Sequence, residues 1–300
     1  MRKILLVGLA AFLFLFGLAL VLSLFVASTA GDGATLSFGK KLAVLPVKGE
    51  ISSEKSVRDG VYADDLVEDL DKAEKDSTVA GIFLDIDSPG GSVVPTKQIV
   101  YKIRSLEKPV VAYIGEMGAS GGYYIAASAD YVVADEDSLT GSIGVISLLP
   151  NLQGLLEKIG VKMEVLKEGE NKAIASPFTE LTADQRKIMQ GLLSDVYAKF
   201  KADVLAFRKG KVRLKLFDEL ADGRILSGRQ ALDAGLIDLT GSKEDALKKA
   251  AELSGIEGEP ELVKYEKKEL SLLDFFMQAG SAFGYSFKNA LLSETRLSIK

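Results

Sequence analysis

Short apolar segments alternate with amphipathic segments along most of this chain. Compact apolar runs predict buried strands, and apolar residues at helical spacing between charges predict helices. The expected strands are residues 42–47, 80–86, 109–114, 131–134 and 143–146. The expected helices are residues 62–75, 94–106, a short one ending at 128, 182–209 (with Thr182 as N-cap and Asp184 in its first turn), 228–239 and 243–253. This alternation predicts an α/β fold with a mostly parallel sheet.

The N-terminal segment has a different pattern. Residues 4–26 carry no charge, and as a helix they would reach roughly 35 Å, enough to cross a hydrocarbon core. The span is longer than the apolar core of a cleaved signal peptide, although the small residues 27–30 leave cleavage as an alternative. Arg2 and Lys3 precede the span, so we expect a single-pass protein of the cell membrane with its N-terminus inside and its catalytic domain extracytoplasmic.

The expected organisation follows from these two patterns. Residues 1–30 form a transmembrane anchor, residues 31–40 a linker, residues 41–257 the main domain and residues 258–300 a C-terminal tail. The tail mixes charged stretches with Leu and Phe. It is open whether it packs on its own domain, docks elsewhere, contacts another copy or lies at a membrane interface.

Composition narrows the chemistry. The net charge is −5 and the pI about 5.2, so there is no basic surface to suggest a nucleic-acid partner. The sequence contains no cysteine and no histidine. These absences exclude disulfides, thiolate nucleophiles, imidazole bases and metal sites built from those residues. We expect no metal and no cofactor. Any nucleophilic catalysis needs a base other than imidazole.

Two glycine-rich turns follow expected strands. Ser120 lies in Gly-Ala-Ser-Gly-Gly (118–122), between a strand and a helix, where a serine side chain is exposed near free backbone amides. Ser-Pro-Gly-Gly (88–91) offers a second set of amides. Both turns fall at the carboxyl edge of the sheet, where ligands bind in such folds. On the residues alone, Ser120 is as well explained as a helix cap and residues 88–91 as an ordinary turn.

A lysine can serve as that base. Lys172 follows Glu-Asn and precedes Ala-Ile-Ala, so its surroundings are partly acidic and partly apolar. A lysine accepts a proton only when it is neutral, which requires an apolar, water-poor site. A solvated surface charge is the alternative for Lys172. Ser142, in Thr-Gly-Ser-Ile-Gly-Val (140–145), is expected at the start of a strand, either as a turn residue or as a group that orients the lysine.

Taken together, these segments resemble the signal peptide peptidase A family. The resemblance rests on residues 88–91, 119–126, 140–145, 171–173 with 176–178, 221–224 and 230–238, in that order along the chain. It extends from about residue 41 to residue 256 and includes the N-terminal span. One departure is the Glu-Asn pair before Lys172, where the family more often has a small or aromatic residue.

The resemblance implies a membrane-anchored serine peptidase with a fold similar to ClpP and the crotonases. It implies that Ser120 is the nucleophile, Lys172 the general base and Ser142 the residue that positions the lysine. Gly91 and Gly121 would supply the oxyanion amides. The expected substrates are remnant signal peptides and membrane-associated proteins. Each block occurs once, as in the short form of the family, which implies a homo-oligomeric ring in which the dyad lies within one domain or across a subunit contact.

Two alternatives belong to other functional classes. A crotonase-like acyl-CoA enzyme would use the same pair of oxyanion loops for a thioester enolate, but it would leave Ser120 without a role. A membrane scaffold would keep the fold without turnover. Labelling of Ser120 by a fluorophosphonate would separate the enzyme from the scaffold.

Overall fold

The computed structural model describes residues 40–54 and 60–265, which belong to the unit formed by Lys40–Lys300. The expected membrane span, the linker and most of the C-terminal tail lie outside the described residues. Within the part of the chain that is described, no helix has the length and apolar character needed to cross a membrane.

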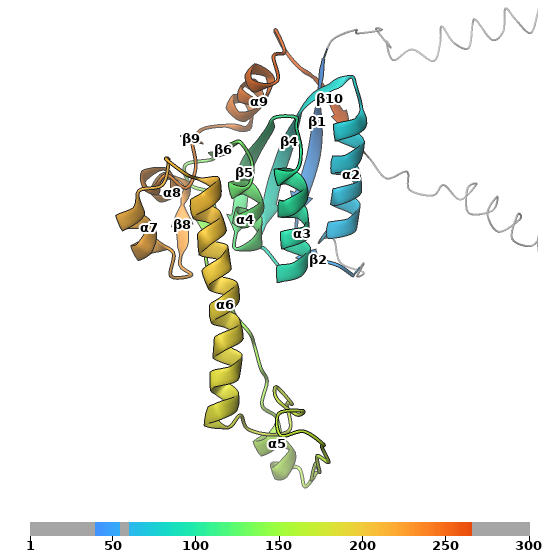
Figure 1. The fold of residues 1–300 in the computed structure, drawn as a ribbon, viewed down its shortest axis with the longest axis vertical. Helices are drawn as coiled ribbons and strands as arrows, with labels where there is room; N and C mark the ends of the chain where they lie inside the picture. The colour runs from blue at the N-terminus through green and yellow to red at the C-terminus, as the bar shows by residue number, and fades with distance from the viewer. Residues whose placement is uncertain (1–39, 55–59, 266–300) are drawn as a thin grey trace, which may run out of the picture. The chain divides into compact units, whose positions relative to one another are not determined.

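A mostly parallel sheet forms the centre of the molecule (Figure 1). Among the described residues it has eight strands, with β10-β1-β4-β5-β6-β9 as the main order; β7 pairs with β5, and β8 pairs with β7. β7 and β8 are antiparallel, and the other pairs are parallel. The strands are β1 (Lys41–Lys48), β4 (Val79–Ser88), β5 (Val110–Ala119), β6 (Tyr131–Ala134), β7 (Leu139–Gly141), β8 (Ile225–Ser227), β9 (Leu239–Thr240) and β10 (Glu261–Lys264). A small parallel pair is formed by β2 (Glu50–Ser52) and β3 (Gly60–Tyr62).

Helices cover both faces of this sheet, as Figure 1 shows. On one face, α2 (Ala63–Lys75), α3 (Val93–Arg104) and α4 (Gly121–Ala127) pack over the larger apolar core. On the other face, α9 (Lys243–Leu253) packs through Ala246, Ala250 and Ala251. The continuous apolar strands β1 and β4 are buried from both sides, which explains their uniformly hydrophobic sequences.

The remaining helices lie at the side of the sheet that carries β6 to β9. They are α6 (Ala183–Phe207), α7 (Leu214–Leu220) and α8 (Gly228–Ala234). Thr182 caps α6 through a capping box with Gln185, and Asp184 lies in its first turn, as the sequence predicts. The C-terminal half of α6 packs on the core, and its N-terminal half extends away from the sheet (Figure 1).

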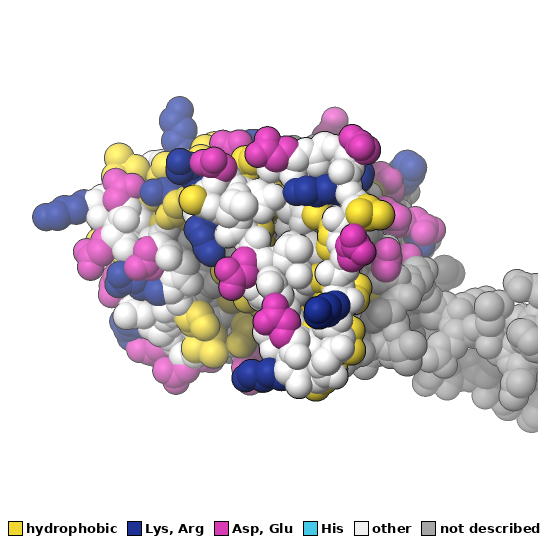
Figure 2. Space-filling view, turned by 90° about the horizontal axis from the view of Figure 1, so that it is seen from below, with side chains coloured by type: hydrophobic (Ala, Val, Ile, Leu, Met, Phe, Trp, Pro, Cys, Tyr) yellow, Lys and Arg dark blue, Asp and Glu magenta, His cyan; other side chains and the backbone are white. Residues whose placement is uncertain are grey.

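We call residues 146–182 the arm; it precedes α6 and contains the short helix α5 (Gln153–Lys158). None of these residues is buried, and all of them are described. Many large apolar side chains are exposed along the arm: Ile146, Leu148, Leu149, Leu152, Leu155, Ile159, Val161, Met163, Val165 and Leu166. Seen from the end at which the arm lies, the surface shows such apolar side chains among interspersed charges of both signs (Figure 2).

Three expectations from the sequence differ from the structure. Residues 143–146 are not a strand; the strand here is β7 (Leu139–Gly141). Beyond β7 the chain passes close to Gly223, because a Cβ added to Gly144 would lie only 3.0 Å from the Gly223 Cα. The helix expected to reach residue 239 ends at Ala234, because Gly235 adopts the left-handed conformation. The sheet also includes β10, beyond the expected end of the domain at residue 257.

Candidate active site

Ser120 occupies a sharp turn between β5 and α4. Its backbone has φ 52° and ψ −118°, a conformation that a residue with a Cβ rarely adopts. The turn is held by two hydrogen bonds, since the Ser120 N–H donates to the Gly141 carbonyl and the Ser120 carbonyl accepts from the Tyr124 N–H, each at 2.9 Å. A strained strand-to-helix turn of this kind displays a nucleophilic side chain at the edge of a sheet.

Ser120 does not act as a helix cap. Its side chain makes no capping hydrogen bond to α4, whereas Thr182 and Ser227 each accept one from the backbone of the helix that follows. Ser120 is half-buried and lines a cleft. Its role therefore has to be sought in the cleft that it faces.

The two glycine-rich turns are in direct contact. Gly90 has φ +98°, and a Cβ there would lie 2.6 Å from the Gly121 nitrogen and 2.9 Å from the Ser120 Cβ. In the bridge between this turn and Ile51, the Gly90 carbonyl accepts from the Ile51 N–H and the Ser92 N–H donates to the Ile51 carbonyl. The Gly91 N–H takes no part in this bridge. Gly121 is the first residue of α4, and helix geometry gives its N–H no partner within the helix. Both amides are therefore suited to bind a developing oxyanion.

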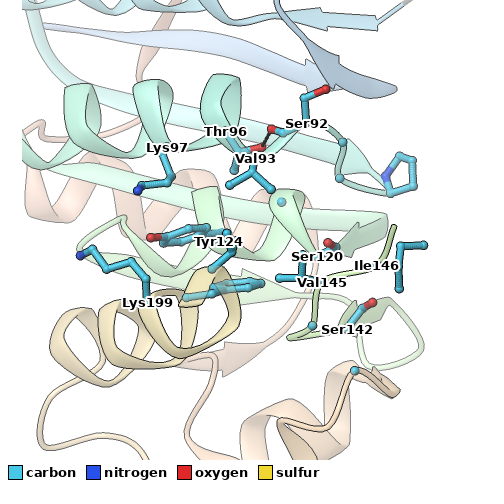
Figure 3. A pocket seen from close by; sticks show the side chains of 18 of the residues that line it. Ser92, Val93, Thr96, Lys97, Ser120, Tyr124, Ser142, Val145, Ile146 and Lys199 are labelled. Carbon is cyan, nitrogen blue, oxygen red and sulfur yellow. Dashed lines mark hydrogen bonds between the residues drawn. The ribbon is translucent and has the colours of Figure 1, made fainter. Parts of the chain in front are cut away.

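A cleft of about 880 Å³ runs past Ser120 (Figure 3). Gly91, Gly121 and Ser142 line it together with the serine, so the structure brings four of the five expected site residues to one cavity. Ser142 follows β7 instead of beginning a strand, has φ 50° and donates its N–H to the Arg224 carbonyl at 2.8 Å.

Lys172 is the exception. It lies in a turn of the arm, with its N–H bonded to the Gly169 carbonyl at 3.1 Å, and its side chain is exposed. It does not line the cleft that contains Ser120. Within one copy of the chain, the structure therefore does not bring the expected base to the expected nucleophile.

Two other lysines do line the cleft, Lys97 on α3 and Lys199 on α6. Figure 3 shows both amino groups near the Tyr124 hydroxyl, at the opposite end of the cleft from Ser120. The hydrogen bond to Asp203 raises the pKa of Lys199, which keeps it protonated. The Lys97 amino group lies 5.7 Å from the centroid of the Tyr101 ring. These positions make neither lysine a suitable base for Ser120.

The cleft wall contains residues that sequence reasoning did not single out. Tyr124 and Phe200 line the cleft and stack with ring centroids 4.4 Å apart, and Thr96 is buried beneath Gly121. Tyr124 lies one helical turn after Ser120, so its place in the wall could have been inferred from that spacing. Phe200 has no such signal, because only the packing of α6 brings it to the site. The described residues contain no cluster of acidic side chains able to hold a metal ion.

Comparison with known proteins defines the class to which this fold and site belong. The family model described as "Peptidase family S49" matches residues 102–257, and the one described as "Clp protease" matches residues 39–134. The chain belongs to peptidase family S49 and is a serine peptidase with a mixed α/β, ClpP-like fold.

Individual relatives agree with this assignment. A Methanocaldococcus jannaschii protein named as a protease is 35% identical over 295 residues, which cover 95% of this chain and 94% of that protein. A Synechocystis protein, also named as a protease, is 39% identical and covers 73% of this chain and 76% of its own length. A protein of Enterococcus faecium named as a signal peptide peptidase SppA is 37% identical and covers 73% of this chain and 64% of its own length. The acyl-CoA enzyme and scaffold alternatives gain no support from these matches.

Proposed function

We propose that this peptidase is a membrane-anchored endopeptidase that hydrolyses remnant signal peptides with a Ser120–Lys172 dyad. The observation that carries the proposal is the strained turn at Ser120. The Ser120 hydroxyl makes no helix-capping hydrogen bond, and the residue lines a cleft together with Gly91 and Gly121. The absence of histidine and cysteine leaves lysine as the base with the right chemistry.

A second copy of the chain supplies Lys172 in this proposal. Lys172 lies on the arm, away from the cleft of its own copy, and the arm exposes apolar residues such as Leu155 and Leu166, which are 57% and 88% exposed. Exposed apolar side chains gathered on one segment are typical of a protein interface. A head-to-tail contact, in which the arm of one copy covers the cleft of the next, would bury them and lead to a ring.

The chemistry then has two halves. Neutral Lys172, oriented by Ser142, accepts the Ser120 proton while the oxygen attacks the substrate carbonyl, and the amides of Gly91 and Gly121 bind the oxyanion. The lysine passes the proton to the leaving amine, and an acyl-enzyme remains on Ser120. A water molecule, deprotonated by Lys172, then attacks this ester; the lysine returns the proton to the Ser120 oxygen as the acyl bond breaks and the second fragment leaves.

The membrane part of the proposal rests on the sequence of residues 4–26, which are apolar, uncharged and preceded by Arg2 and Lys3. An anchor there would hold the peptidase domain on the extracytoplasmic side, next to peptides left in the membrane. Peptide substrates follow from the peptidase family, and the name of the Enterococcus faecium relative supports signal peptides as the class.

The test uses three variants of the full chain: Ser120→Ala, Lys172→Ala and, as a matched control, Lys162→Ala, an exposed lysine of the same arm. Cleavage of a fluorogenic signal-peptide fragment is expected to fall at least about a thousandfold in the first two, as it does when a dyad member is removed. The control should retain activity within about twofold.

Mixing the two inactive variants tests the contact between copies. If Lys172 acts on the Ser120 of a neighbour, co-assembly at equal amounts should restore about a quarter of the wild-type activity. Each site between two copies has a probability of one half of containing an intact Ser120 and one half of containing an intact Lys172. If the mixture stays inactive although assembly is shown by sedimentation, the dyad does not form between copies. If Lys172→Ala alone keeps full activity, Lys172 is not the base.

A further inference from the structure

Tyr124 lies where α4, the helix after Ser120, meets α6, the helix after the arm. Tyr124 belongs to α4, and its ring stacks on Phe200 of α6. Its backbone N–H bonds the Ser120 carbonyl at 2.9 Å. The same residue therefore contacts the turn that displays the nucleophile and forms part of the cleft wall.

Asp203 determines where this ring can lie. The Tyr124 hydroxyl donates to one carboxylate oxygen of Asp203, and the Lys199 amino group donates to the other. The Asp203 side chain is only 12% exposed, so its two donors replace the water that it has lost. Burial raises the pKa of Tyr124, and the Asp203 bond raises it further, so the hydroxyl keeps its proton. The hydrogen bond between Tyr124 and Asp203 therefore holds the hydroxyl end of the ring beside this carboxylate.

We infer that Asp203 is a positioning residue that sets the substrate preference of the cleft by holding the Tyr124 ring as its wall. The inference rests on the proposed peptidase function. Tyr124 lines the cleft together with Phe200, Val93 and Val145, so the orientation of its ring affects the room and the apolar contact available to a substrate side chain. Asp203 itself is not among the lining residues, so it acts on the substrate through Tyr124.

The experiment compares Tyr124→Phe, which removes only the hydroxyl, with Asp203→Asn, which keeps the shape of the side chain and removes its charge. Two peptides that differ only in having Leu or Ala before the scissile bond are cleaved by the full-length protein. Each variant should change the Leu-to-Ala ratio of kcat/KM by about fivefold or more, mainly through KM. Asp184→Asn, an exposed aspartate on α6, is the matched control and should leave the ratio within about 1.5-fold.

The double variant distinguishes a shared role from two separate ones. Because the two side chains act as one unit, Tyr124→Phe with Asp203→Asn should change the ratio no more than the stronger single variant. Labelling of Ser120 by a small fluorophosphonate should stay within about twofold in all variants, since the probe does not need the wall. An unchanged ratio, with kcat lowered equally for both peptides, would overturn the inference.

Other outcomes separate this inference from the proposed function. If the wild-type chain neither cleaves peptides nor reacts with the fluorophosphonate, the proposed function fails. If Ser120 is labelled and both peptides are cleaved, but effects of Tyr124→Phe and Asp203→Asn add fully, the proposed function stands and the positioning role does not. Should Asp203→Asn fail to fold, Tyr124→Phe alone decides, because an unchanged Leu-to-Ala ratio in that variant contradicts the inference.

Discussion

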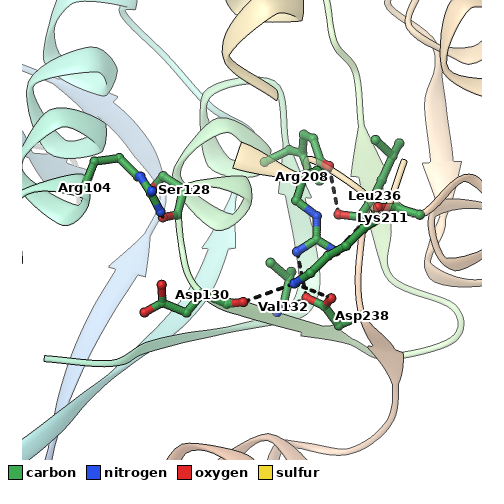
Figure 4. Close-up of polar contacts among 10 residues, drawn as sticks. Arg104, Ser128, Asp130, Val132, Arg208, Lys211, Leu236 and Asp238 are labelled. Atoms are coloured by element: carbon green, nitrogen blue, oxygen red, sulfur yellow. Dashed lines mark hydrogen bonds and ion pairs between the residues drawn. The ribbon is translucent and has the colours of Figure 1, made fainter. Parts of the chain in front are cut away.

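The two ends of α6 lie in opposite surroundings. At its C-terminal end, Arg208 is fully buried and donates to Asp238 at 2.7 Å, and Lys211 contacts the other oxygen of that carboxylate at 2.7 Å (Figure 4). We call these three residues the clasp. At the N-terminal end, Ile188 and Leu192 are 44% and 58% exposed, and the arm beyond them has no buried residue.

The contrast separates stability from association. In the clasp, Arg208 is buried and Asp238 is largely buried, and they pair with each other; Asp238 also accepts a hydrogen bond from the Val132 N–H at 2.8 Å. Along the arm, apolar groups are exposed and the described residues offer them no cover. Damage to the clasp should therefore unfold the chain, and damage to the arm should change what the chain assembles with.

The largest effect is expected from Asp238→Ala. This change leaves the Arg208 charge buried without its carboxylate partner, so the free energy of unfolding should fall by about 3–5 kcal/mol. Urea denaturation of the wild type and the variant measures the difference. Glu136→Ala is the matched control, because it breaks the exposed pair with Arg229, which solvent screens, and should leave stability nearly unchanged. Equal losses in the two variants would contradict the contrast.

Acid tests the same interaction without mutation. Burial alone would raise the pKa of Asp238, but the hydrogen bonds and charges of Arg208 and Lys211 outweigh it and hold the pKa below its usual value. A carboxyl with a lowered folded-state pKa stabilises the fold above its unfolded pKa of about 3.9, and the contribution is lost as the pH falls further. Between pH 5 and pH 2, the wild type should therefore lose more stability than Asp238→Ala.

An intermediate effect is expected from Leu155→Glu on the arm. If, as proposed, the arm brings Lys172 of one copy to Ser120 of the next, a charge there should prevent assembly and lower peptide hydrolysis at least about a hundredfold, or about 2.7 kcal/mol. The unfolding free energy should change by less than about 0.5 kcal/mol. Leu262→Glu, at an exposed leucine of β10, is the control and should leave assembly intact. Sedimentation and activity are measured together; a fully active monomer would refute the role of the arm.

The smallest effects come from two helix caps. Ser227→Ala removes the cap of α8, which packs on the core, and should lower the unfolding free energy by about 1 kcal/mol. Thr182→Ala removes the same type of capping box at the exposed end of α6. It should speed amide hydrogen exchange in the first turn of α6 and change global stability by less than about 0.5 kcal/mol. A global loss as large as that of Ser227→Ala would show that the arm contributes to the stability of the core.

Local features of the site could be predicted from the sequence. A strand, a glycine-rich turn and a helix around Ser120 follow from residues that are neighbours in the chain, and the contact between the two turns follows from the parallel sheet. The sequence predicts a strand at residues 143–146, and the structure has none there. Their apolar pattern is that of a strand, but Ile143 is buried in the core and Gly144, Val145 and Ile146 line the cleft beyond β7, where no strand lies beside them among the described residues.

The sequence by itself determined the α/β fold, the glycine-rich turn at Ser120 and the exclusion of an imidazole or thiolate mechanism, because each depends on residue types and short-range order. Only the tertiary structure decided that α6 forms a wall of the cleft, that Asp203 reaches Tyr124 and that Arg208 meets Asp238. It also separated Lys172 from the cleft of its own chain. These relations join segments far apart in sequence, and no local pattern encodes how a long helix packs or which groups it brings together.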